Sequence, residues 1–143
     1  MGCIVGVCVG EKRGVGKKNV KEGYLKKDYG LPGDAHAGME KQVSVLAMET
    51  IEEAASAKGI TALPGDFAEN ITLRGVDLKG VKRGQRLRLG EAEVEVVQVG
   101  KEPDPSHSFS FHGMALLVTE GCFCRVTRSG PVKVGDLAEI IEE

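Results

Sequence analysis

Gly65-Asp66-Phe67-Ala68-Glu69-Asn70-Ile71-Thr72 is the stretch around which we expect the chain to be organised. With Pro64 before it, the stretch begins as a Pro-Gly-Asp turn, because proline fixes φ, glycine permits a positive φ and aspartate can bond its own backbone. A β-favouring run follows the turn. The turn therefore delivers three polar side chains, those of Asp66, Glu69 and Asn70, to the start of a strand.

A second Gly-Asp turn, Gly33-Asp34-Ala35-His36-Ala37-Gly38, carries the first of three histidines. A carboxylate beside an imidazole can fix the tautomer of the histidine, so Asp34 and His36 form a candidate acid–base pair. Asp66 with Glu69 is the corresponding pair in the other turn. Two polar turns that each lead into an apolar strand favour a functional site between them. The alternative is that both are ordinary turns with solvated acids.

The composition excludes several classes of protein. The chain has 143 residues, 41% of them hydrophobic, and a net charge of −2, so we expect one domain over residues 1–143. The lack of tryptophan, the 4% of aromatic residues and the interspersed charges argue against a nucleic-acid partner. No apolar run approaches the roughly eighteen residues of a membrane-spanning helix, so we expect no membrane partner. Four cysteines without a signal-peptide pattern predict reduced thiols in a cytoplasmic protein.

The hydrophobic pattern predicts many short strands and one helix. The segments expected to form strands are 3–9, 42–47, 86–89, 92–99, 114–118 and 121–126. The helix is expected to span Met48–Lys58. Its apolar stripe consists of Ile51, Ala54 and Ala55. Gly59 follows as a stop signal. This order predicts a mainly β protein, a closed barrel or sandwich with one helix packed outside and short turns.

Two further segments are candidates for chemistry. Residues 11–19 are basic and contain glycines, but their spacing matches neither Gly-rich phosphate motif, so we expect a solvated loop rather than a phosphate cradle. Cys122-Phe123-Cys124 lies in a predicted strand, so both thiols face the same way. The two thiols are a soft-metal pair, a persulfide carrier or two core positions. Zinc binding with His36, His107 or His112 is a further alternative, although the spacing matches no zinc motif.

The order of these motifs resembles the MOSC family, named after the C-terminal domain of molybdenum cofactor sulfurases. The resemblance runs from about residue 4 to residue 140 and is carried by residues 33–38, 41–46, 65–72, 84–89, 98–102 and 134–136. The chain is similar to a small, stand-alone, bacterial-type member. The resemblance implies a closed β-barrel-like MOSC fold, which agrees with the strand pattern.

The resemblance also implies a link to the molybdenum cofactor, molybdopterin. Relatives are thought to carry sulfur for this cofactor, or to bind it and reduce N-hydroxylated compounds. Such a site needs polar groups for the pterin edge, basic groups for the phosphate and a thiolate, the suitable soft ligand for molybdenum. The positions that match the family motif and could serve the pterin are Asp34, His36, Asp66, Glu69 and Asn70. Lys41 and Lys101 could serve the phosphate.

The chain departs from the family pattern in one place. Many small relatives follow a Gly-Lys-Glu sequence with the cysteine proposed to hold molybdenum or sulfur, whereas this chain has Pro103 there. Cys122 and Cys124 are then the candidate catalytic thiols and metal ligands.

Three hypotheses stay open. The first is a molybdenum-cofactor-binding protein, an oxidoreductase that acts on N-hydroxylated compounds. The second is a persulfide carrier that exchanges sulfur with a donor or a cofactor-biosynthesis protein. The third is a non-catalytic ligand-binding or regulatory domain that has lost the family cysteine. Pyridoxal phosphate is not expected, because nothing in the chain marks a Schiff-base lysine.

Overall fold

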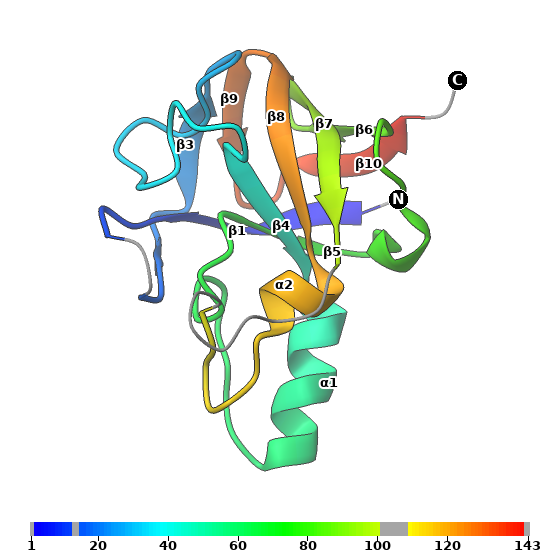
Figure 1. Ribbon diagram of the computed structural model, residues 1–143. Helices are drawn as coiled ribbons and strands as arrows, with labels where there is room; N and C mark the ends of the chain where they lie inside the picture. The colour runs from blue at the N-terminus through cyan, green and yellow to red at the C-terminus, as the bar shows by residue number, and fades with distance from the viewer. Residues whose placement is uncertain (1, 13–14, 101–108, 142–143) are drawn as a thin grey trace.

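A closed β-barrel forms the centre of the computed structural model, which describes residues 2–12, 15–100 and 109–141 (Figure 1). Within these residues seven strands form the barrel: β1 (Gly2–Val9), β4 (Val43–Ala47), β5 (Ile71–Arg74), β6 (Arg86–Leu89), β7 (Ala92–Val99), β8 (Cys122–Arg128) and β10 (Leu137–Ile141). Their order is β10-β6-β7-β8-β4-β5-β1, and β10 pairs back with β1 to close the ring. The predicted mainly β, barrel-like fold is confirmed.

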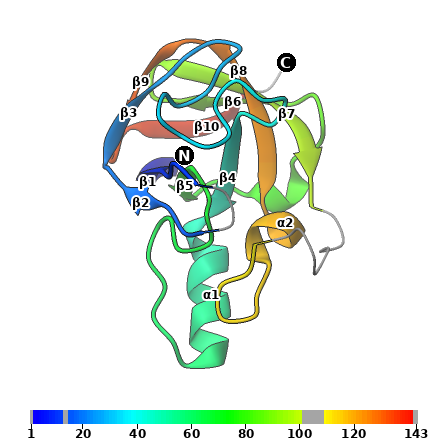
Figure 2. The ribbon, with the colours of Figure 1, turned by 60° about the vertical axis from the view of Figure 1, so that its left-hand side comes forward.

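Shorter elements flank the barrel: β2 (Lys18–Asn19), β3 (Glu22–Leu25), β9 (Gly130–Lys133), α1 (Met48–Lys58), η1 (Leu78–Gly80) and α2 (Leu116–Glu120). β3 and β9 pair with each other in a separate two-stranded ribbon. Figures 1 and 2 show α1 and α2 together at one end of the barrel and the β3–β9 ribbon at the other end. β4 and β5 pair in parallel, and α1 lies in the crossover that this parallel pairing requires.

The interior of the barrel is filled by apolar side chains from alternate strand positions. In β7, Ala92, Val94 and Val96 are buried, while Glu93 and Glu95 are half-buried on the outer side, as the period-two pattern predicts. All seven barrel strands contribute to this interior cluster. Its burial is the main source of stability for the barrel.

A second apolar cluster lies between the outside of the barrel and the helices. Ile51 and Ala55 of α1 face this cluster, and the helix has the bounds that the sequence predicts. Gly59 ends the helix in the left-handed region, with φ at 69°. Phe67 is buried in the same cluster, and its ring meets the ring of Phe111 edge-on with centroids 5.2 Å apart. The turn at residues 65–70 is therefore pinned to the outer wall of the barrel.

The strand predicted at residues 114–118 is wrong. The apolar run there ends in α2, one short helix whose Leu117 packs into the outer cluster. A short apolar run does not distinguish a buried strand from a buried helix by periodicity. The mixed segment 20–29 is compatible with a strand or a short extended piece, and the structure forms β3 within it.

Replacement of Gly6 by alanine tests the close packing of β1 against Pro64 and Thr72, residues on either side of the 65–70 segment. A Cβ at Gly6 would lie 2.5 Å from Pro64 Cβ and 2.8 Å from Thr72 Oγ1. We expect Gly6→Ala to lower the free energy of unfolding by about 1–3 kcal/mol through overpacking. Gly80→Ala is the matched control, because a Cβ at Gly80 meets nothing within 4 Å. Urea denaturation measures the free energy of unfolding of both variants. Equal stability of Gly6→Ala and Gly80→Ala would contradict the close packing at Gly6.

Candidate functional site

The first Gly-Asp turn is held by a buried ion pair. Asp34 Oδ1 lies 2.6 Å from Lys17 Nζ, and the two side chains are 0% and 1% exposed. The same oxygen accepts a hydrogen bond from the backbone N–H of Gly10, and Oδ2 accepts one from the N–H of His36. Burial raises the pKa of Asp34, but the hydrogen bonds from His36, Lys17 and Gly10 outweigh it and hold this pKa well below its usual range. Asp34 is therefore an ionised anchor for three loop segments.

His36 is the exposed member of this group. Its Nδ1 lies 3.3 Å from Lys17 Nζ and 3.6 Å from Asp34 Oδ2, and its side chain is 36% exposed. The expected pairing of Asp34 with His36 is present in the structure. Lys17 was missed, because the sequence predicts a solvated loop at residues 11–19.

Glu69 lies completely buried beneath the second Gly-Asp turn. Its Oε2 accepts hydrogen bonds from the Gly65 N–H at 3.0 Å and from the Thr72 hydroxyl at 2.6 Å. Its Oε1 is buried and has no hydrogen-bond partner among the residues that the structure describes. Burial raises the pKa of Glu69, because desolvation disfavours the carboxylate more than nearby hydrogen-bond donors, Gly65 and Thr72 first among them, stabilise it. Glu69 is thus biased towards the neutral acid.

Asn70 clamps three strands together. Its Nδ2 donates to the carbonyl of Cys8 in β1, and its Oδ1 accepts from the backbone N–H and the hydroxyl of Ser44 in β4. Asn70 itself precedes β5. Both the Nδ2 and the Oδ1 of the amide are bonded inside the protein, which is the arrangement of a structural group.

The remaining predicted residues are dispersed. Asp66 Oδ2 accepts from the Leu63 N–H and closes its own turn. Lys41 Nζ lies 5.5 Å from the ring centroid of Phe123, on the outer face of β8. Lys101, proposed for the phosphate, lies outside the described residues.

The structure brings the two Gly-Asp turns together. The backbone N–H of Lys17 donates to the Gly65 carbonyl at 2.8 Å, while the side chain of the same lysine binds Asp34. Both turns also contact the end of β1, through Gly10 and Cys8. Lys17 is therefore the residue that joins the two halves of the candidate site.

Cys122 and Cys124 point into the barrel rather than towards these turns. Their Sγ atoms lie 4.0 Å apart, both residues belong to the interior cluster, and they are 1% and 0% exposed. The contact with Cys122, together with burial, raises the pKa of the Cys124 thiol. Cys8 is also buried, and burial raises its pKa. Cys3, the remaining cysteine, is half-buried.

Two further observations bear on the site. Across residues 2–12, 15–100 and 109–141, no group of three or more His, Cys, Asp or Glu side chains is arranged to hold a metal ion. In the same part of the chain, no helix has the length and apolar character needed to cross a membrane.

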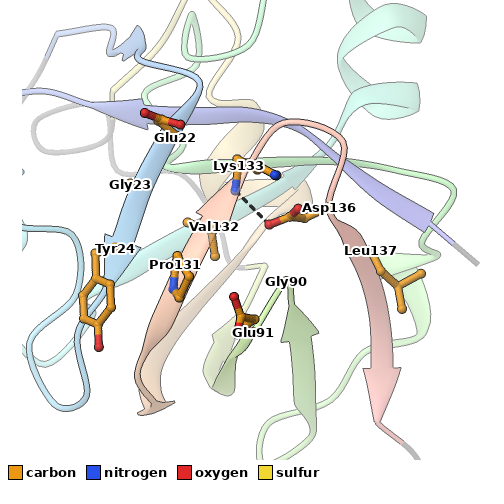
Figure 3. Close-up of a pocket in the computed structure, with 10 residues that line it drawn as sticks. All are labelled: Glu22, Gly23, Tyr24, Gly90, Glu91, Pro131, Val132, Lys133, Asp136 and Leu137. Atoms are coloured by element: carbon orange, nitrogen blue, oxygen red, sulfur yellow. Dashed lines mark hydrogen bonds between the residues drawn. The ribbon is translucent and has the colours of Figure 1, made fainter.

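Two grooves lie away from both turns. One of about 690 Å³ lies between β3, β9 and the start of β10 (Figure 3). Another of about 360 Å³ lies between α1 and residues 75–79. Neither groove is lined by a residue of the turns at 33–38 and 65–72.

The chain belongs to the MOSC domain family, since the family model matches residues 32–139. Three solved structures are similar to the chain. YiiM from Geobacillus stearothermophilus is 22% identical with a TM-score of 0.74, over 99% of this chain and 76% of that one. YuaD from Bacillus subtilis is 22% identical with a TM-score of 0.72, over 96% and 94%. YiiM from Escherichia coli is 23% identical with a TM-score of 0.70, over 100% and 71%. At these identities the likeness supports the fold alone. No curated protein matches the sequence.

Asp34→Asn tests the buried ion pair. The variant leaves the Lys17 ammonium buried without a counter-charge, so we expect the free energy of unfolding at pH 7 to fall by about 3–5 kcal/mol. Because the folded pKa of Asp34 lies below its unfolded value, the wild type holds this stabilisation above about pH 4 and loses it as the pH falls towards the folded pKa. We expect urea denaturation between pH 7 and pH 3 to show that the difference in free energy of unfolding between the wild type and Asp34→Asn is smaller at pH 3 than at pH 7.

The double variant Lys17→Met, Asp34→Asn is the control for this pair. It removes both charges, so it should regain part of the stability that Asp34→Asn loses. A single variant as stable as the wild type at pH 7 would contradict the anchoring role.

Glu69→Gln tests the neutral-acid bias. The folded pKa of Glu69 is raised, so the wild type loses stability as the pH rises above the unfolded value of about 4.3. Glutamine keeps an acceptor for Gly65 and Thr72 and does not titrate. We therefore expect the variant to be more stable than the wild type at pH 8 and to lose this advantage below about pH 4. Glu53→Gln, on the exposed face of α1, should show no such pH-dependent gain.

Proposed function

We propose that this chain is a non-catalytic, ligand-binding member of the MOSC domain family. The observation that carries the proposal is the position of Cys122 and Cys124, whose thiols face each other inside the closed barrel. Thiol chemistry needs a thiolate that a substrate or metal can reach. Cys122 and Cys124 are 1% and 0% exposed, and the pKa of Cys124 is raised. Both features disfavour an accessible thiolate.

The residues present do not fit a molybdenum cofactor held by a cysteine. A thiolate ligand would have to lie at the surface near the two Gly-Asp turns. Cys8 is the cysteine nearest to them, and it is completely buried with a raised pKa. Asp34 and Asn70, which the family motif assigns to the pterin, form their hydrogen bonds within the protein. We therefore derive no reaction step through this cofactor.

The persulfide-carrier hypothesis meets the same obstacle. A carrier cysteine must attack a sulfur donor and later meet an acceptor, so its thiolate has to be accessible. The half-buried Cys3 lies at the start of β1, whereas the turns meet the opposite end of that strand. A ligand-binding role needs no thiolate. Among the motif residues it would use His36, which is 36% exposed beside the first turn, and Lys41, which lies over Phe123 on the outer face of β8.

Metal and pterin content test the proposal directly. We would purify the protein without oxygen from a host that makes the molybdenum cofactor, and measure molybdenum and pterin per chain. We expect far less than one of either per chain, because the one cysteine near the two Gly-Asp turns, Cys8, is buried and the half-buried Cys3 lies at the other end of β1. Near-stoichiometric molybdenum that is lost in Cys122→Ser or Cys124→Ser, but kept in Cys3→Ser, would overturn the proposal.

Thiol reactivity gives a second readout on the same sample. In the native protein, we expect the thiol reagent DTNB to modify Cys3 alone, and after denaturation all four cysteines should react. An intact mass should show no added sulfur that a reductant removes. A removable increment of one sulfur on Cys122 or Cys124 would support the carrier hypothesis instead.

A further inference from the structure

A preformed groove lies at the end of the barrel opposite the helices. We call it the ribbon groove, because the β3–β9 ribbon forms one wall and the start of β10 forms the other (Figure 3). Its volume of about 690 Å³ is within the range of ligand-binding clefts. The hairpin turn between β6 and β7, at Gly90 and Glu91, lies between the two walls.

The walls of the ribbon groove are fixed by the backbone. The N–H of Gly90 donates to the Leu137 carbonyl at 2.9 Å, and the N–H of Val134 donates to the Lys21 carbonyl at 2.8 Å. Gly90 has a positive φ of 60°, and a Cβ there would lie 2.6 Å from Asp136 Oδ2. Glycine at this position therefore allows the turn to approach Asp136 closely. The groove does not need a ligand to take its shape.

The charge of the ribbon groove is negative. Three carboxylates line it, those of Glu22, Glu91 and Asp136, against one ammonium group, that of Lys133. Within the described part of the chain, the carboxylates of Glu22 and Glu91 form no ion pair or hydrogen bond. Asp136 Oδ2 accepts the backbone N–H of Lys133 at 3.1 Å, so it belongs to the local turn. Two carboxylates are thus available to a cationic group.

Apolar side chains gather around the same groove. Tyr24 on one wall is 49% exposed and Leu137 on the other is 41% exposed. Pro131, which pairs with Tyr24 across the ribbon, is also exposed. Val134, which follows Lys133 of the groove in the sequence, is 41% exposed. Exposed apolar side chains rimmed by polar residues are a feature of protein-interaction sites.

We propose that the ribbon groove binds an arginine side chain that lies between apolar residues in an extended segment of a partner protein. A guanidinium group can form two parallel hydrogen bonds to a carboxylate, which Glu22 and Glu91 offer, and it stacks on aromatic rings such as that of Tyr24. Its weaker hydration favours it over an ammonium group in a partly apolar groove. The flanking apolar residues would contact Leu137 and Val134. This inference goes beyond the proposed function and uses none of its residues.

The test is a titration of the ¹⁵N-labelled protein with a capped peptide, acetyl-Ala-Leu-Arg-Leu-Ala-amide. We expect saturable shifts of the backbone amide signals of Gly23, Gly90 and Leu137. The same peptide with glutamate in place of arginine should bind at least about tenfold more weakly, because it loses the charge-assisted hydrogen bonds.

Variants of the protein assign the binding to the groove. The double variant Glu22→Gln, Glu91→Gln and the variant Tyr24→Ala should each weaken peptide binding by about tenfold or more. Glu53→Gln, an exposed carboxylate of α1, should leave binding unchanged. The ¹⁵N spectrum of each free variant shows whether it remains folded.

Several results would overturn the proposal. These are no shifts at millimolar peptide, equal binding of the glutamate peptide, or wild-type affinity in the double variant. If arginine amide bound as tightly as the peptide, the flanking apolar residues would add nothing. The ligand of the groove would then be a small molecule and not a segment of a partner protein. None of these results depends on molybdenum content or thiol reactivity, so failure here and failure of the proposed function are distinguishable.

Discussion

The amide of Asn70 is the interaction on which the rest of the site depends. It joins β1 and β4 at the start of β5, where the parallel pairing of the barrel begins. If the buried amide lost these partners, the protein would lose more stability than the hydrogen bonds contribute, because the polar groups of the amide would remain desolvated. The same junction positions the 65–70 turn, and Lys17 then attaches the 33–38 turn to it. The polar residues of the two Gly-Asp turns thus have a structural role: they hold the strands and the turns of the site together.

Local sequence patterns were sufficient to predict much of the fold. The helix α1 has its predicted bounds because its apolar stripe and the Gly59 stop signal that follows it are local features of the sequence. The β6–β7 hairpin follows from alternation and a two-residue turn. The run at 114–118 was misread because its helical form depends on the outer cluster, which no local window contains. The pairing of β3 with β9 joins segments about a hundred residues apart, so sequence alone could not give it.

The candidate site was predicted only in part, because some of its features follow from local patterns and others depend on contacts between distant parts of the chain. The convergence of the two Gly-Asp turns is present, and the shared face of Cys122 and Cys124 follows from strand periodicity. Periodicity does not say whether that face lines the interior or the surface. Nothing near Lys17 in the sequence marks it as buried, because its burial depends on a carboxylate seventeen residues further along. The chemistry of a residue is therefore less predictable than its position in an element.

The closure of the barrel has a consequence for how the chain folds. Among the described residues, the paired positions of β1 and β10 are Gly2 with Ala138 and Cys3 with Leu137. The contacts that seal the ring thus join the most distant parts of the sequence, and the entropy of closing so large a loop slows folding. During synthesis β1 leaves the ribosome long before its partner exists. Until β10 emerges, one edge of β1 stays unpaired, which makes the growing chain a target for chaperones and for misassociation.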